Sequence, residues 1–273
     1  MRPPRLRVEH LNKMEHVDEY DESLMAVMSL VWGEGFMAPG GEGNVDKLVE
    51  GLELQGKRVL DIGCGLGKPA CILAEKYGAY VVGTDLEDHL IERSKQRAIK
   101  LGLTQQTEFR VVEPGPLNFA DESFDIIVSS GAFTQIDEKL SMYRECLRVL
   151  NPGGILSCYD WMKSEGEYSQ DMLYWFEVEG LTYAMETKKE HRQLLLASGF
   201  ATVTISDRSP WFKKKVKQEV EQLKTEYFPE IVNLIGQQKA EHFLEDWRMT
   251  SVICDKGEML QVYSRATKAE QRI

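Results

Sequence analysis

A glycine-rich segment between an apolar strand and a helix constrains the fold of this 273-residue chain more than any other feature. Residues 59–69 read VLDIGCGLGKP. Glycines stand at three alternate positions, Gly63, Gly65 and Gly67. Glycine allows a tight turn there and lets a ligand lie against bare main chain. A second apolar run, residues 80–84, ends at Asp85, where an acid is placed to bind the two hydroxyls of a ribose. The two segments together predict a nucleoside-binding site.

The spacing of the glycines separates one nucleoside ligand from another. A dinucleotide fingerprint reads G-x-G-x-x-G, and a phosphate loop ends in G-K-[ST]. Here the spacing is G-x-G-x-G, and Lys68 is followed by Pro69. Asp61, at the end of the first strand, would repel a pyrophosphate and attract a cation. The pattern D-x-G-x-G-x-G resembles the signature of class I S-adenosylmethionine methyltransferases, in which the acid helps to hold the amino group of the cofactor's methionine.

The resemblance extends from residue 54 to about residue 267 and implies further cofactor contacts. It places Asp85 on the ribose and Leu86 against the adenine. Residues 117–125 (LNFADESFD) match the L-P-F-x-D-x-S-F-D run of the family, and counting back from them places Glu113 at the adenine amino group. Residues 129–133 would pass under the methionine and the sulfonium, and Gly41 would let an N-terminal loop close on the carboxylate. The implied cofactor-binding residues are Asp61, Gly63, Gly65, Gly67, Asp85, Leu86, Glu113, Ser129 and Gly41.

Alternating strand and helix patterns predict an α/β fold with a mainly parallel sheet. The expected strands are residues 58–62, 80–84, 107–112, 124–128, 155–159, 201–205 and 259–266. We expect a Rossmann-like, seven-stranded class I methyltransferase sheet in which the last two strands form an antiparallel pair. The interpretation is one domain, residues 1–273, that acts as a monomer or homodimer. It divides into an N-terminal lid (1–50), a core (51–208 and 258–268) and a helical cap (209–257) inserted before the last strand.

Composition excludes several classes of partner. The net charge of the chain is −11, whereas binding to DNA or RNA needs clustered lysine and arginine, so no nucleic acid is expected. No apolar run approaches the length needed to cross a bilayer, so no membrane is expected. The five cysteines contain no C-x-x-C pair, which predicts a reducing compartment, the cytoplasm, without disulfides. The five histidines show no metal-ligand spacing, so no metal is expected.

A narrower resemblance concerns the methyl acceptor. Tyr20, the Trp32-Gly33-Glu34 run and the tail at residues 245–248 are similar to segments of phosphoethanolamine and glycine/sarcosine-type N-methyltransferases. The phosphobase enzymes carry a D-A-x-x-H run after the fourth strand, and its histidine pairs with the N-terminal tyrosine. Gln135 stands at that histidine position here, and Met28 and Leu181 fall where tyrosine and arginine are expected. These departures argue against phosphoethanolamine itself as the acceptor.

Methyl transfer from S-adenosylmethionine is an in-line displacement on a carbon that is already activated. The protein mainly holds the nucleophile ~3 Å from that carbon and removes water, and a base is needed only for a protonated nucleophile. The expected catalytic residues are Tyr20, Gln135 and Asp160. Residues expected to bind the acceptor are Trp32, Trp161 and Tyr183, through cation–π contacts, and Arg248, through a carboxylate.

Three functions remain open at this point, and O-methylation of a small acid or phenol ranks below methylation of nitrogen or sulfur. The favoured one is N-methylation of a small amine or amino-acid-like metabolite. S-methylation of a thioether such as methionine is the second, because a thioether has a free lone pair and needs no base. The third, from another class of protein, is a non-catalytic module that binds S-adenosylmethionine and regulates a partner.

Overall fold

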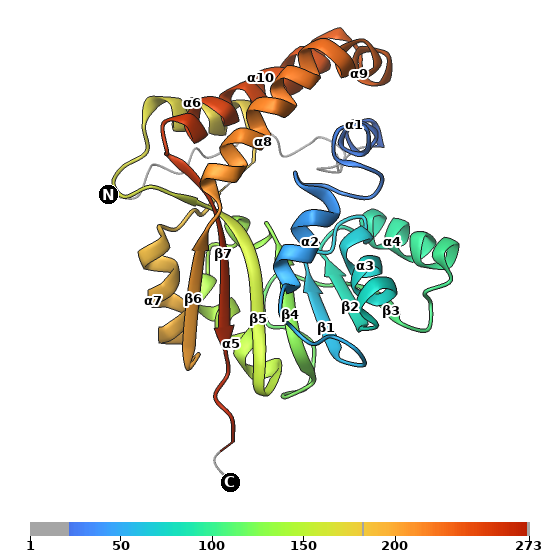
Figure 1. Cartoon of the computed structure of the whole chain (residues 1–273), viewed down its shortest axis with the longest axis vertical. Coiled ribbons are helices and arrows are strands. Elements are labelled where there is room, and N and C mark those ends of the chain that lie inside the picture. Colours follow the sequence, from blue (N-terminus) through green and yellow to red (C-terminus); the bar gives the residue numbers. More distant parts are fainter. Residues whose placement is uncertain (1–21, 182, 272–273) are drawn as a thin grey trace.

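A seven-stranded sheet forms the centre of the computed structural model, which describes residues 22–181 and 183–271 (Figure 1). The strand order is β3-β2-β1-β4-β5-β7-β6. The strands are β1 (Arg58–Ile62), β2 (Tyr80–Asp85), β3 (Thr107–Val111), β4 (Phe124–Ser130), β5 (Leu150–Lys163), β6 (Thr202–Asp207) and β7 (Met259–Thr267). The pairs from β3 through to β5 are parallel, and β7 runs antiparallel to both of its neighbours. The expected class I methyltransferase sheet, with its antiparallel last pair, is confirmed.

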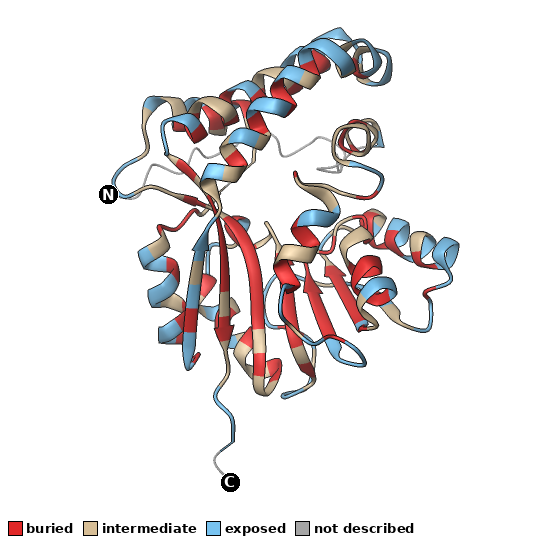
Figure 2. Ribbon diagram, viewed as in Figure 1, coloured by how far each residue is buried: buried red, intermediate tan, exposed pale blue. Residues whose placement is uncertain are grey.

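Helices cover both faces of the sheet, because successive strand residues point to opposite sides. On one face, Val59 and Val81 pack against three helices, α2 (Gly41–Val49), α3 (Lys68–Tyr77) and α4 (Asp88–Leu101). On the other face, Leu60 and Val82 pack with α5 (Lys139–Val149) and α7 (Lys188–Ser198). The five inner strands are consequently buried along most of their length, whereas the edge strands β3 and β6 are largely exposed (Figure 2).

A helical cap lies above the carboxyl ends of the parallel strands (Figure 1). Between β6 and β7 the chain forms α8 (Ser209–Gln222), the π-helical turn η2 (Leu223–Tyr227), α9 (Phe228–Ile235) and α10 (Gln237–Asp255). A third apolar cluster joins these helices to α1 (Glu22–Trp32) and α6 (Gln170–Glu179). The cap is therefore assembled from three separate segments of the chain rather than from the expected insertion alone.

Three features of this region differ from the expected secondary structure. Helix α6 had not been expected, although Ser169 caps its start by accepting a hydrogen bond from the backbone of Met172. The expected lid loop near residue 41 is the start of α2. The sequence pattern from Pro229 to Asp246 predicts one helix, but the structure has two there, because Gly236, with φ +81°, ends α9.

Candidate active site

A cavity of about 1020 Å³ lies between the strand ends and the cap. Its floor comes from the turns after β1, β2 and β4, and its roof from α1, α6 and α10. Ligands of doubly wound sheets bind at this edge, beyond the carboxyl ends of the strands. The cavity therefore joins the glycine-rich turn to the aromatic side chains of the cap in one space.

The glycine-rich turn requires glycine for two different reasons. Gly63 and Gly65 line the cavity at φ +72° and +52°. A Cβ atom on Gly63 would lie 2.5 Å from the Cβ of Ala132, so glycine lets the ends of β1 and β4 approach each other. Gly67 does not line the cavity. Its Cβ would lie 2.6 Å from the Ser94 hydroxyl, so Gly67 serves the packing of α3 against α4.

Two acidic side chains lie beside this turn. Asp85, at the end of β2, lines the cavity, and its carboxylate accepts hydrogen bonds from the backbone of Gly65 (2.9 Å) and of Glu87 (3.2 Å). Asp61 lies behind the turn, is 1% exposed, and has one carboxylate oxygen without a hydrogen-bond partner. Burial, followed by the charge of Asp85, raises the pKa of Asp61 to about 7. A cation near this turn would reduce the repulsion between the two carboxyl groups.

The other expected cofactor residues are spread around the cavity. Leu86 and Glu113 line it, and both are exposed. Gly41 lines a smaller cavity of about 70 Å³ that shares Gly63 and Gly65 with the larger one. Ser129 is fully buried and its hydroxyl donates to the Ile62 carbonyl (3.0 Å), so the structure does not place it at the cavity. The three residues that follow it line the wall instead, Ser130, Gly131 and Ala132.

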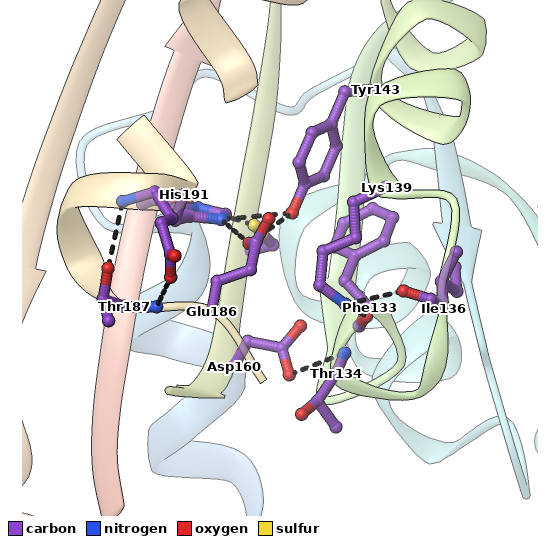
Figure 3. Close-up of polar contacts among 12 residues, drawn as sticks. Phe133, Thr134, Ile136, Lys139, Tyr143, Asp160, Glu186, Thr187 and His191 are labelled. Carbon is purple, nitrogen blue, oxygen red and sulfur yellow. Dashed lines mark hydrogen bonds and ion pairs between the residues drawn. The ribbon is translucent and has the colours of Figure 1, made fainter. Parts of the chain in front are cut away.

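Gln135 lines the cavity from the short helical turn η1 (Phe133–Gln135), which is held from two sides (Figure 3). From β5, Asp160 accepts a hydrogen bond from the Thr134 backbone (3.1 Å). From α5, the buried Lys139 ammonium donates to the carbonyls of Phe133 (2.5 Å) and Ile136 (2.7 Å).

Asp160 does not itself line the cavity. One of its oxygens accepts from the backbone of Thr134 and of Trp161, and the other is buried without a hydrogen-bond partner. Burial raises its pKa to about 7, although the nearby Lys139 charge opposes the shift. The structure therefore does not place Asp160, expected as a catalytic residue, at the cavity: its carboxylate bonds to the turn that carries Gln135.

A second buried polar group lies next to this turn (Figure 3). The Tyr143 hydroxyl donates to Glu186 (3.2 Å), and the same carboxylate contacts His191 Nδ1 (2.8 Å). His191 Nε2 contacts the Ser264 hydroxyl (2.8 Å). These residues come from α5, the segment before α7, α7 itself and β7. No local sequence motif therefore indicates that they meet.

The expected acceptor-binding residues divide into two groups. Trp32, Trp161 and Tyr183 all line the cavity. Arg248 does not: its guanidinium pairs with the carboxylate of Glu245 (2.6 Å) in a partly exposed position. The structure therefore does not place Arg248 at the cavity. Tyr20 lies outside the described residues.

Two acids of the cap line the cavity and were missed by sequence reasoning, Glu179 and Asp246.

Among the residues that the structure describes, no three His, Cys, Asp or Glu side chains gather as they do in a metal site. No helix in the same part of the chain is long and apolar enough to span a bilayer.

Comparison with known proteins agrees with this geometry. A family model described as a methyltransferase domain matches residues 60–158, which hold the glycine-rich turn, Asp85 and η1. The chain has the fold of a class I methyltransferase. Phosphoethanolamine N-methyltransferase 1 of Arabidopsis thaliana is 31% identical over 76% of this chain and 42% of the relative. The chain spans less than half the length of the curated phosphoethanolamine N-methyltransferases that it matches.

Solved structures share the fold of this methyltransferase domain. Phosphoethanolamine N-methyltransferase 2 of Haemonchus contortus, in complex with phosphomonomethylethanolamine and S-adenosylhomocysteine, superposes with a TM-score of 0.85 at 20% identity. The match covers 93% of this chain and 58% of that one. A candidate sarcosine dimethylglycine methyltransferase of Galdieria sulphuraria gives a TM-score of 0.81 at 18% identity, over 92% and 98% of the two chains.

Proposed function

We propose that this chain is an enzyme that binds S-adenosylmethionine and methylates the nitrogen of a small amine. The observation that carries the proposal is the single cavity that joins the glycine-rich turn and Asp85 to Gln135 and the aromatic residues of the cap. The relatives named above as N-methyltransferases support the same reaction class.

The residues present fit the cofactor. The unpartnered carboxylate oxygen of Asp61 is suited to an ammonium group, and Asp85 to the two hydroxyls of a ribose. Leu86 and Glu113 offer an apolar and an acidic wall to the adenine. The small cavity beside Gly41 provides room for the carboxylate end. When bound, S-adenosylmethionine supplies a methyl group that its positive sulfur has already activated.

The chain's own contribution is to hold the acceptor and to exclude water. Gln135 offers an amide to the acceptor from a turn that Asp160 and Lys139 fix in place. Trp32 and Trp161 provide aromatic walls, and aromatic rings attract a methylated ammonium as it forms. The largely apolar wall also limits the water that can compete with the acceptor.

S-methylation of a thioether is the second candidate. The observation that favours it is Gln135, because an amide cannot take up the proton that an amine must lose. A thioether carries no such proton, so it could react in the same cavity without a base.

Titration calorimetry tests the cofactor, and product mass tests the reaction. Asp85→Ala should weaken S-adenosylmethionine binding at least tenfold, whereas Asp88→Ala, an exposed acid on the same segment, should leave the affinity within twofold. A broad amine and thioether panel, read by product mass, then reports which acceptor gains a methyl group. Absent cofactor binding would overturn the proposal. Binding without S-adenosylhomocysteine formation from any acceptor would instead favour the regulatory module.

We also propose a cytoplasmic location. All five cysteines are buried and free, which suits a reducing compartment. Cell fractionation tests this proposal, and recovery of the native protein from a secreted fraction would contradict it.

A further inference from the structure

The cap presents two carboxyl groups that are bonded to each other on the wall of the cavity. Glu179 ends α6 and Asp246 lies in α10, and the two side chains share a hydrogen bond. Each is also held by a neutral aromatic donor. The Trp175 indole donates to Asp246 (2.9 Å), and the Tyr183 hydroxyl donates to Glu179 (2.8 Å). The orientation of both carboxyl groups is therefore fixed before any ligand arrives.

Burial determines the charge of this acid pair. Asp246 is 8% exposed, and desolvation, followed by the nearby charge of Glu179, raises its pKa well above the ordinary value. Two carboxyls in contact retain one proton between them where both cannot ionise together. A cation that binds beside the two carboxyls can replace that proton, and the low polarity of the surroundings strengthens its attraction.

Aromatic rings line the same cavity as the acid pair. Trp161 lies 6.1 Å from both Trp175 and Tyr183 between ring centroids, and Trp32 lies 5.2 Å from Trp247. Except for the buried Trp175, these rings line the cavity. An apolar carbon skeleton would bury its surface against them, and an ammonium would gain cation–π attraction.

The charges on the cavity wall distinguish between acceptors. Among the described lining residues, the acids are Asp85, Glu87, Glu113, Asp137, Glu138, Glu179 and Asp246, and Lys239 is the one lysine or arginine. A phosphate group requires several arginine or lysine donors. A cavity wall with mostly acidic side chains therefore opposes binding of a phosphorylated acceptor and favours binding of a cationic one.

We propose that the Glu179–Asp246 acid pair binds the cationic amino group of the methyl acceptor. The acceptor is then an amine with an apolar body and no phosphate or carboxylate. The inference rests on the proposed function, since it assigns the acceptor class for the same cavity.

Binding measurements test the acid pair apart from catalysis. Three probes are compared for binding to the same cavity: 2-phenylethylamine, 3-phenylpropionate and phosphoethanolamine. 3-Phenylpropionate has a body similar to that of the amine and the opposite charge. With S-adenosylhomocysteine saturating the protein, 2-phenylethylamine should bind at least tenfold more tightly than either anionic probe. Glu179→Gln and Asp246→Asn should each weaken amine binding about tenfold and leave the S-adenosylhomocysteine affinity within twofold. Glu245→Gln, a partly exposed neighbour in α10 that pairs with Arg248, is the matched control and should change neither affinity.

Each outcome has one meaning. Tighter binding of phosphoethanolamine or 3-phenylpropionate overturns the inference, as does failure of the amine to bind or equal amine affinity in all three variants. If Asp246→Asn disturbs folding, Glu179→Gln decides alone, because Glu179 is only half-buried. Amine binding that needs the acid pair but yields no methylated product would refute the proposed function and leave the binding site intact.

Discussion

Gly63→Ala is the sharpest test of the glycine-rich turn, because the chain contains a matched control. Gly63 and Gly102 have nearly the same backbone angle, φ +72° and +71°. Placing an L-residue in this left-handed region costs about 1–2 kcal/mol at either position. At Gly102 the new Cβ meets no atom within 4 Å, whereas at Gly63 it lies 2.5 Å from the Cβ of Ala132. Overpacking of this kind adds about 1–3 kcal/mol, so we expect about 2–5 kcal/mol for Gly63→Ala.

The free energy of unfolding, from urea denaturation, measures the stability difference between the two variants. Calorimetric titration with S-adenosylhomocysteine measures its consequence for the site. Gly63→Ala should lose affinity because the end of β4 lines the cavity, and Gly102→Ala should not. Adding Ala132→Gly to Gly63→Ala should recover the overpacking part of the loss. Equal destabilisation by the two single variants, or no recovery in the double variant, would refute the close approach of β1 and β4 as the reason for glycine.

Three other predictions concern the acceptor side. Arg248→Ala should change the free energy of unfolding by no more than about 1 kcal/mol and leave acceptor KM unchanged, because its ion pair with Glu245 is partly exposed; steady-state kinetics and urea denaturation check both. The pKa of Asp160 is raised from 3.8 to about 7, so between those values the folded chain binds a proton that the unfolded chain has released, and stability falls as pH rises. Asp160→Asn should remove that part of the fall. The free energy of unfolding of the variant, from urea denaturation, should therefore rise relative to that of the wild type between about pH 4 and about pH 8. Lys139→Met should cost about 3–5 kcal/mol, because it leaves a buried carboxyl and two carbonyls without their cation, and a stability loss below about 1 kcal/mol in the same measurement would contradict the clamp on η1.

Local patterns predicted the central elements well. The bounds expected for β1, residues 58–62, agree with the structure, because an apolar run stands between clear breakers there. For β5 the expected five residues, 155–159, extend to Leu150–Lys163. Residues 152–154, Pro-Gly-Gly, interrupt the sequence pattern without ending the strand, since a register shift opposite β4 absorbs them. Antiparallel pairing with β7, a long-range contact, holds the other end out to Lys163.

The two halves of the cavity differ in how far sequence determines them. The cofactor half follows from one strand–turn–helix segment and the next strand end, so a local motif carried most of it. Ser129 was misplaced by a single position, and on a strand that error reverses the face to which the side chain points. The acceptor half is built from cap helices that are far apart along the chain, and nothing local in either helix indicates that Glu179 and Asp246 meet.

The charges on the two halves are related through the proposed reaction. The bound ammonium first releases one proton to solvent, which frees the nitrogen lone pair. Methylation of the resulting neutral amine then moves one positive charge from the sulfur to the nitrogen, so the total charge within the cavity does not change during the transfer. Asp61 and Asp85 stand on the side where that charge begins, and the Glu179–Asp246 acid pair stands on the cap side where it would end. Carboxyls already oriented by Trp175 and Tyr183 stabilise a developing ammonium without reorganising, which lowers the barrier more than an equal charge in water would. An acceptor that ends the reaction uncharged would gain nothing from the acid pair, and for this reason the structure favours nitrogen over oxygen as the atom methylated.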